Sequence, residues 1–423
     1  MSKTFRDWDV EQGWLLPPSV LDFVPPDHLA HFVRDTVRES LDLSAIMAQY
    51  TEERGYPPYH PTMMTALLLY AYCQGVYSSR RIAKGCTERL DFMAVTGLNQ
   101  PDFRTVSDFR KRHLGALSGL FVQVLKLCRQ AGLAKLGHVA LDGTKVKANA
   151  LKHKSMSYKR LGEKEAQLKR EVAEWFKRAD AIDESEDREE RNAAPTVMPE
   201  WVANKQARIQ RIREAKAALE AEAKSQGEAQ PKPKEQYNFT DPQSAIMKGP
   251  DSFVQAYNAQ AVVDADSQVI VAQALSDRPT DVTLLGQMVG QIKANTGRQA
   301  QEFSADAGYC SEGNLAVLAR RKVRAYIATG KQRHGQAKIV GRGRQARTQA
   351  MRRRLARGAY RSRYRLRKQT VEPVFGQIKQ ARGFRQFLLR GLDKTSGEWS
   401  LICTVHNLLK LAARRSRGNV APS

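Results

Sequence analysis

The pattern of apolar positions predicts a helical N-terminal domain over residues 1–132. Between residues 27 and 41 apolar side chains return every three or four positions, as in an amphipathic helix: Leu29, Phe32, Val33, Val37 and Leu41. A buried helix is expected to begin at Pro61 or Thr62, because residues 63–76 are almost wholly apolar. Two further helices are expected over 78–95 and 105–113, separated by the Gly- and Pro-containing segment 97–101.

The last two of these helices resemble a helix-turn-helix. The second one carries three consecutive cations, Arg110, Lys111 and Arg112. These side chains are therefore candidate contacts to DNA. Packing inside an ordinary helical domain is an equally good explanation of the same pair.

Strand-like alternation begins after residue 132. Residues 138–143 are expected to form a strand that ends in a turn, residues 144–150 a second strand, and residues 253–263 and 268–274 two more. A helix over 281–294, a strand over 302–305, a helix over 311–320 and a strand over 323–328 follow. This order predicts an α/β domain, a mixed sheet flanked by helices, built from residues 133–155 and 236–415.

The interval 156–235 interrupts that domain. It is strongly charged, and its apolar residues follow helical spacing in two stretches separated by Pro195 and Pro199. A narrow apolar stripe suits a helical hairpin that is not buried on all sides. We therefore expect an inserted hairpin whose charges form a solvated face.

Composition narrows the class of partner. The chain has 423 residues, with 69 Lys and Arg against 44 Asp and Glu, a formal net charge of +25 and a pI of about 10.0. This excess of positive charge indicates a polyanionic partner. Charge alone does not distinguish a DNA enzyme from an RNA binder of the ribosomal type or from a basic membrane-surface protein. The five cysteines stand singly, which argues against a zinc site or a disulfide framework and favours a reducing cytoplasm. Neither a signal peptide nor a membrane span is expected from the apolar runs.

Three acidic residues are candidates for phosphodiester chemistry. Asp142 is expected at the C-terminal end of a strand, Asp306 directly after one, and Glu372 near the start of a late helix. Each alone is explained by a turn, a cap or a solvated helix face. However, residues 331–370 contain fifteen Lys or Arg and no acidic residue, so Glu372 directly follows a segment suited to a phosphate backbone. Two metal ions held by converging carboxylates stabilise the attacking and leaving oxygens of such a reaction.

Several segments together resemble the DDE transposases of bacterial insertion sequences: LDGTKVKANA, DPQSAIM, YNAQAVVDAD, SADAGY, VEPVFGQIK and the N-terminal PDFRTVSDFR. The resemblance covers nearly the whole chain. It implies a ribonuclease-H-like catalytic domain in which Asp142, Asp306 and Glu372 bind two Mg²⁺ ions, with Mn²⁺ as a substitute. It also implies cleavage and strand transfer on double-stranded DNA, at the element ends and the target, by a homodimer associated with the nucleoid.

Related enzymes carry a Tyr-x2-Arg-x3-Glu-x6-Lys signature around the last acid. Lys379 keeps the six-residue gap after Glu372, whereas Tyr364 and Arg367 lie one residue too early, a rotation of about 100° on a helix. Lys368 has the expected spacing instead. We therefore expect Lys379 above all to contact DNA phosphate, with Tyr364, Arg367 and Lys368 as further candidates.

The basic segment from Lys331 to Lys368 is expected to follow the DNA path, and it includes three consecutive candidates for phosphate contact, Arg352, Arg353 and Arg354.

Other polar residues have structural explanations. Tyr257 and Asn258 are expected to pack a strand, Asp241 to sit in a turn, and Asp281 to cap a helix. Two other functions compete with a transposase, namely a non-catalytic DNA-binding regulator and a nuclease of the same fold. Three intact acidic residues favour an enzyme over a pure binder, because carboxylates repel phosphate.

Overall fold

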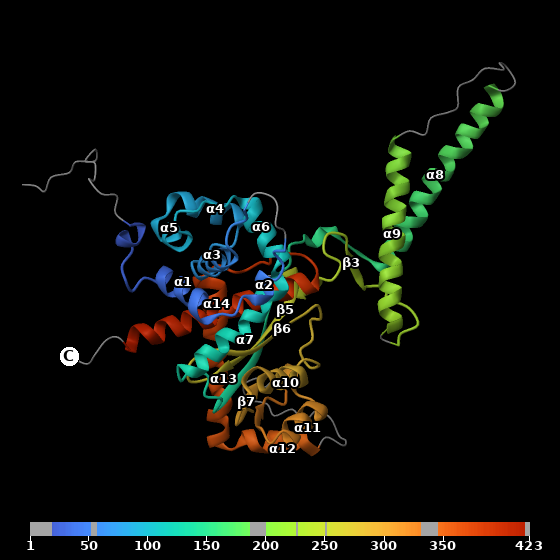
Figure 1. Ribbon diagram of the computed structural model, residues 1–423. Coiled ribbons are helices and arrows are strands. Elements are labelled where there is room, and N and C mark those ends of the chain that lie inside the picture. The colour runs from blue at the N-terminus through green and yellow to red at the C-terminus, as the bar shows by residue number, and fades with distance from the viewer. Residues whose placement is uncertain are drawn as a thin grey trace, which may run out of the picture.

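The computed structural model of the chain combines a helical N-terminal region, a central mixed sheet and a long helical hairpin that projects away from both (Figure 1). It describes residues 19–51, 57–186, 200–225, 227–249, 252–330 and 346–418.

The N-terminal region is helical, as its apolar pattern predicts. α1 matches the expected amphipathic helix, and α3 begins at Pro61, where a residue without an N–H is favourable because that group has no partner in the first turn. Most side chains of α3 are buried, in line with its apolar sequence. The elements of this region are η1 (Val20–Phe23), α1 (Leu29–Ser40), α2 (Ser44–Met47), α3 (Pro61–Cys73), α4 (Ser79–Glu88), α5 (Leu90–Thr96), α6 (Phe103–Arg112) and α7 (Leu114–Gln130).

The single helix expected over 78–95 is in fact two, α4 and α5. Arg89 between them has extended backbone angles, φ −125° and ψ 121°. The bend brings the Phe92 ring against Gly85, where a Cβ would lie only 3.0 Å from a ring carbon. The apolar residues keep helical spacing across Arg89, so the sequence pattern alone does not reveal this break. The break accompanies the complete burial of Phe92.

The central sheet is mixed, as predicted. Its strands are β1 (His138–Lys147), β4 (Ala245–Lys248), β5 (Phe253–Asp264), β6 (Ile270–Ser276), β7 (Glu302–Ala305) and β8 (Arg324–Ile327). The order is β4-β5-β1-β7-β8, and β6 also pairs with β5. β5 runs antiparallel to β1 and β6, while β7 is parallel to both β1 and β8.

The turn expected at Asp142–Gly143 does not occur. β1 continues through this dipeptide and pairs with β5 from Val139 to Lys147. β7 is shorter, and its last pair with β1 joins Ala305 to Leu141. Asp142 therefore lies inside β1 but at the place where the neighbouring strand ends.

Helices cover the sheet and join it to the N-terminal region. α13 (Gly358–Gly376) packs along β1, β5, β7 and β8, and the long α14 (Leu392–Gly418) packs against α7, α3 and β6. The Asn407 amide on α14 bonds both the N–H and the carbonyl of Ile270 in β6. The apolar core runs without interruption from the N-terminal helices through the sheet to α14. The remaining elements are α10 (Leu285–Thr296), η3 (Ala307–Tyr309), α11 (Glu312–Arg320), α12 (Ala346–Ala356) and a π-helical turn, η4 (Gln377–Ala381).

The hairpin consists of α8 (Tyr158–Glu186) and α9 (Glu200–Ser225) and has an apolar cluster of its own, separate from the main core. At its base η2 (Lys152–Lys154) precedes a two-stranded sheet of β2 (Ser155–Ser157) and β3 (Gln236–Asn238). Residues 156 and 157 thus belong to a strand, although the sequence predicts helix there. Glu165 on α8 joins the two helices, because its carboxylate accepts hydrogen bonds from Lys216 and Arg213 on α9. Together with a hydrogen bond from Lys169 on α8, these contacts lower the pKa of Glu165 to about 2. The predicted interruption at Pro195 and Pro199 lies outside the described residues.

Candidate active site

Asp142 is a mostly buried carboxylate at the edge created by the end of β7. Its side chain is 18% exposed and forms an ion pair with the guanidinium of Arg367 on α13. Burial raises its pKa to about 6, although Arg367 and the Gly143 N–H act in the opposite direction. Because burial disfavours the charged form of Asp142, a neighbouring cation stabilises that form, and Arg367 is the cation present.

Asp306 directly follows β7 and caps the one-turn helix η3. Its Oδ1 accepts the Gly308 N–H at 2.8 Å. Asp306 lies close enough to Asp142 to raise the pKa of that carboxyl by charge repulsion. The two strand-edge aspartates predicted from the sequence are therefore neighbours.

Asp281 is a third aspartate of this neighbourhood, and it is not the helix cap that the sequence suggests. α10 begins only at Leu285, and the Asp281 side chain points instead to β5. Its Oδ1 accepts from Asn258 Nδ2 at 2.6 Å and from Gln260 Nε2 at 2.8 Å. Lys145 lies 3.7 Å from the same oxygen. Burial lowers the pKa of Lys145, and the nearby charges of Asp281, Asp142 and Asp306 oppose that change.

Glu372 does not join these aspartates in this arrangement. It is exposed near the C-terminal end of α13, not near the start of a helix as expected. Among the described residues, no three His, Cys, Asp or Glu side chains stand close enough together to hold a metal ion. Two predicted acids thus come together, and the third is carried by the helix that packs over them.

Arg367 and Lys379, predicted as phosphate contacts, are engaged within the protein. Arg367 is buried against Asp142. The face of α13 that carries Arg367, which the spacing from Glu372 disfavoured, is therefore the face turned toward Asp142. Tyr364 lies beside it and interacts with its guanidinium. Lys379 donates to Thr144 Oγ1 at 2.6 Å and to the Lys145 carbonyl at 2.7 Å, and burial lowers its pKa to about 8.

Arg110 is a structural residue and not the surface contact suggested by the helix-turn-helix pattern. It is 5% exposed and donates to the Tyr72 hydroxyl, the Tyr77 carbonyl and Ser79 Oγ. The neighbouring cations Lys111 and Arg112 are exposed.

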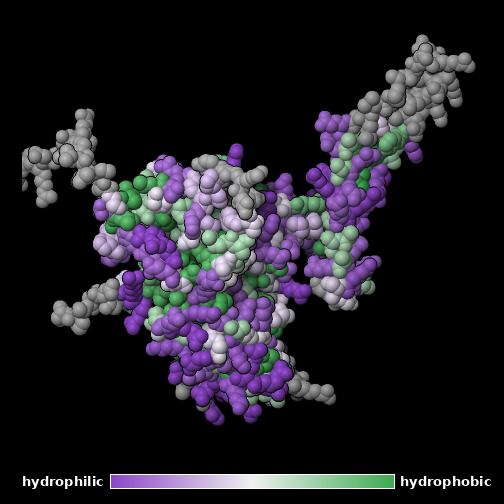
Figure 2. All heavy atoms as spheres, in the orientation of Figure 1, coloured by the Kyte–Doolittle hydropathy of each residue, from purple (hydrophilic) through white to green (hydrophobic). Residues whose placement is uncertain are grey.

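The other predicted cations lie on the surface. Arg352, Arg353 and Arg354 are exposed on α12, Lys368 is exposed on α13, and the surface around α11 and α12 is strongly hydrophilic in Figure 2. The stretch 331–345 of the basic segment lies outside the described residues.

The sequence did not reveal Gln260 and Lys145 as neighbours of the site, and it gave Asn258 and Asp281 only structural explanations. The amides of Asn258 and Gln260 lie two positions apart in β5, and both are fully buried. Polar residues two apart in a buried strand share one face, and this was the available signal. The other structural interpretations hold, because Asp241 and Tyr257 are buried and hydrogen-bonded to each other.

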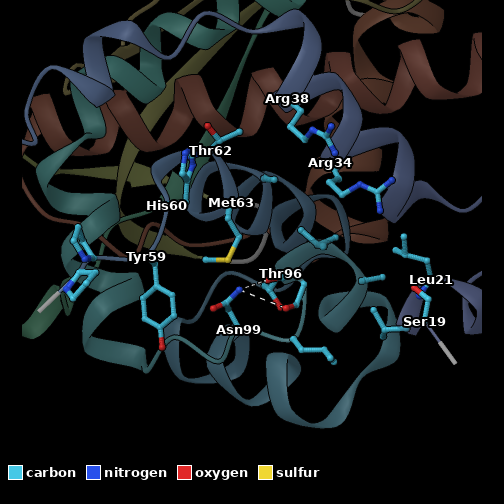
Figure 3. A pocket seen from close by; sticks show the side chains of 18 residues that line it. Ser19, Leu21, Arg34, Arg38, Tyr59, His60, Thr62, Met63, Thr96 and Asn99 are labelled. Atoms are coloured by element: carbon cyan, nitrogen blue, oxygen red, sulfur yellow. Dashed lines mark hydrogen bonds between the residues drawn. The ribbon is translucent and has the colours of Figure 1, made fainter. Parts of the chain in front are cut away.

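A cavity of about 1120 Å³ lies in the N-terminal region, apart from the aspartates. Figure 3 shows it between Arg34 and Arg38 of α1 and the segment around His60 that begins α3. Its lining contains none of the three predicted catalytic acids.

Comparison with protein families agrees with this arrangement. Residues 18–112 match a transposase domain, DUF772, and residues 225–408 match a transposase DDE domain. Neither the curated proteins nor the solved structures yielded a match.

The strand order, the helices on the sheet and the match to a DDE domain together define a ribonuclease-H-like domain. The chain belongs to the DDE transposases of insertion sequences. None of the described helices combines the length and apolar character needed to cross a bilayer.

Proposed function

We propose that the protein cuts double-stranded DNA at the ends of its insertion sequence and joins those ends to target DNA, using Asp142, Asp306 and Glu372. The observation that carries this proposal is the proximity of Asp142 and Asp306, which follow the last paired residues of β1 and β7, Leu141 and Ala305. Transposase domains matched on both sides of the hairpin support the same reaction.

The donor set suits a hard divalent cation. Asp142 and Asp306 offer only oxygen ligands, which Mg²⁺ prefers, and the cation that Asp142 meets in the protein as it stands is the guanidinium of Arg367. Asp142 and Asp306 would hold Mg²⁺ or, in its place, Mn²⁺, and Glu372, exposed on α13, would complete the ligands for two ions once it turns toward them. When bound, the ions supply the positive charge that stabilises the attacking and leaving oxygens of the phosphodiester.

The chain's own cations have separate tasks. Arg367 neutralises Asp142 in the protein as it stands, and Lys145 neutralises Asp281. Lys111, Arg112, Lys368 and the α12 arginines are exposed, so they are the side chains we assign to the phosphate backbone.

The domains divide the work. We assign recognition of the element ends to residues 1–132, catalysis to residues 133–155 and 236–415, and pairing of two copies across the synapse to the hairpin of residues 156–235. The hairpin suits this last role because it projects away from the rest of the protein and carries exposed Phe176 and Trp201 (Figure 1).

The test is cleavage of labelled DNA carrying the element's own terminal repeats, in Mg²⁺ and on random DNA as control. Asp142→Asn, Asp306→Asn and Glu372→Gln should each abolish cleavage and leave the dissociation constant for DNA within about threefold, because only the chemical step loses its carboxylate. Asp266→Asn, an exposed aspartate in the turn after β5, should cleave normally. Normal cleavage by any of the first three would remove that residue from the site, and binding without cleavage by the wild type would favour a regulator.

A further inference from the structure

Asp281 belongs to a hydrogen-bonded network that reaches the segments next to both neighbouring aspartates. The network begins at its Oδ1, which accepts from Asn258 and Gln260. Gln260 Nε2 also donates to Asn258 Oδ1 at 2.9 Å, so the two amides are fixed relative to each other. A half-buried carboxylate with its amide partners fixed in this way has little freedom to rotate.

One branch leads to Asp306. The side-chain carbonyl oxygen of Gln260 accepts the hydroxyl of Tyr309, which is fully buried and is the last residue of the helix that Asp306 caps. A Cβ at Gly308 would lie 3.1 Å from Asp306 Oδ1 and 3.4 Å from Asp281 Oδ2. The second oxygen of Asp281 therefore faces the same space as Asp306, and among the described residues it accepts no hydrogen bond.

The other branch leads to Asp142. A Cβ at Gly143 would lie 2.3 Å from Gln260 Nε2 and 2.9 Å from Asn258 Oδ1, so the amide pair lies directly on the backbone that follows Asp142. Lys145, two residues further along β1, reaches both Asp281 and the Pro279 carbonyl, the latter at 3.2 Å.

We propose that Asp281 is a positioning residue of the active site, which sets the placement of Asp306 against Asp142 through Asn258 and Gln260. This rests on the proposed function in one respect, that Asp142 and Asp306 hold the divalent cation. Partners that orient metal ligands typically change metal affinity by about 10–100-fold when they are removed.

Replacing Asp281 with Asn keeps its size but removes the charge that Lys145 and the two amides share. In asparagine one carboxylate oxygen is replaced by an amide NH₂, which donates hydrogen bonds where the carboxylate oxygen accepts them. The geometry between Asp142 and Asp306 should loosen, while the apolar core remains as it is.

The experiment is a titration of the full-length protein with Mn²⁺, without DNA, followed by electron paramagnetic resonance. Asp281→Asn should weaken Mn²⁺ binding by about tenfold or more, Asp281→Glu should recover part of the loss, and Asp266→Asn should bind as the wild type. The unfolding midpoint of each variant, measured in urea, separates weakened binding from a general loss of fold. Gln260→Met tests the route itself, because its effect should not add to that of Asp281→Asn if both act through one network.

Unchanged Mn²⁺ affinity in Asp281→Asn, with Asp142→Asn and Asp306→Asn both impaired, would overturn the positioning role and leave the proposed function intact. Additive effects of Asp281→Asn and Gln260→Met would also overturn it. Wild-type Mn²⁺ binding by Asp142→Asn and Asp306→Asn would instead refute the metal site on which the inference rests.

Discussion

Glu398 is the acidic residue whose burial has the clearest consequence for stability. It lies on α14 and is 1% exposed, where it accepts the backbone N–H groups of Leu388 and Leu389 at 3.0 to 3.2 Å. Burial raises its pKa from 4.5 to about 7, with these hydrogen bonds and the charge of Arg110 acting against the increase. The buried Arg110, which the sequence suggested as a DNA contact, thus helps to keep this carboxyl in the core.

This pKa predicts that stability falls as pH rises from about 4.5 to 7. In that window the unfolded chain releases the Glu398 proton while the folded chain keeps it, so the unfolded state becomes favoured. At about 1.4 kcal/mol per pKa unit the loss amounts to about 3 kcal/mol. Glu398→Gln keeps an accepting oxygen without the titration, so its free energy of unfolding in urea should fall less than that of the wild type between pH 5 and 8. Glu214→Gln, exposed on α9, is the control, and parallel pH profiles for the wild type and Glu398→Gln would contradict the assignment.

Elements with a complete apolar pattern were predicted well, and those set by long-range contacts were not. α1, α3, β5, β6, β7 and α11 lie close to their expected ranges, because burial of one face or of both faces leaves its period in the sequence. The continuous β1 was missed, since an Asp-Gly pair is also a common turn. Only the pairing of β1 with β5, formed by residues more than a hundred positions apart, keeps the strand extended there.

In the candidate site, too, residues marked by local sequence patterns were predicted, and residues placed by long-range contacts were not. Asp142 and Asp306 could be proposed from the sequence because family motifs mark them and a strand was expected to end at each, although β1 continues past Asp142. Arg367 was misjudged, because its partner Asp142 lies 225 positions away and spacing alone cannot show which helix face meets the sheet. Asp281 was taken for a helix cap, since nothing local reveals the amides of β5.

Gly143 is the residue on which the pairing of β1 and β5 at the site depends. A Cβ there would approach Gln260 Nε2 to 2.3 Å, far inside van der Waals contact. Gly143→Ala should therefore destabilise the fold by about 1–3 kcal/mol in urea unfolding, as overpacked core positions do. It should also displace the amide pair and lower cleavage. Gly137→Ala is the matched control, because a Cβ at Gly137 meets nothing within 4 Å. Equal stability of the two variants would mean that Gln260 moves aside at no cost.

The hairpin should be removable without unfolding the sheet domain. Its apolar cluster is separate from the main core, and its two ends meet where Ser157 pairs with Gln236 in the small sheet. Replacing residues 158–235 with Asn-Gly joins these strands by a two-residue turn that suits antiparallel pairing. We expect the shortened protein to keep one cooperative unfolding transition and the DNA affinity of the wild type, and to lose the pairing of two DNA ends in a gel-shift assay. Failure to fold cooperatively would show that the hairpin supports the core.

At the scale of the whole molecule, helical region and sheet form one body. The main apolar core continues from α1 and α3 through α7 and α14 into β6, so the division at residue 132 is not a division of the core. DNA held by the N-terminal helices and by the sheet edge would therefore contact a single rigid unit. The formal net charge of the whole chain is +25, and its general attraction for DNA makes local contacts hard to separate.

The α12 arginines allow that separation. Arg352, Arg353 and Arg354 are exposed on a helix that packs against α13 and β8, on the strongly hydrophilic part of the surface in Figure 2. Replacing all three with Ala should reduce the slope of log affinity against log salt by about 0.9 for each DNA phosphate that these side chains neutralise. Specific and random DNA should be weakened alike, because the phosphate backbone is the same for every base sequence. The matched control removes three exposed cations from α9, Arg208, Arg211 and Lys224, and changes the net charge equally. Fluorescence anisotropy between about 50 and 200 mM salt measures both slopes. If the control flattened the slope as much as the α12 variant does, the attraction would come from total charge, and the DNA would not follow α12.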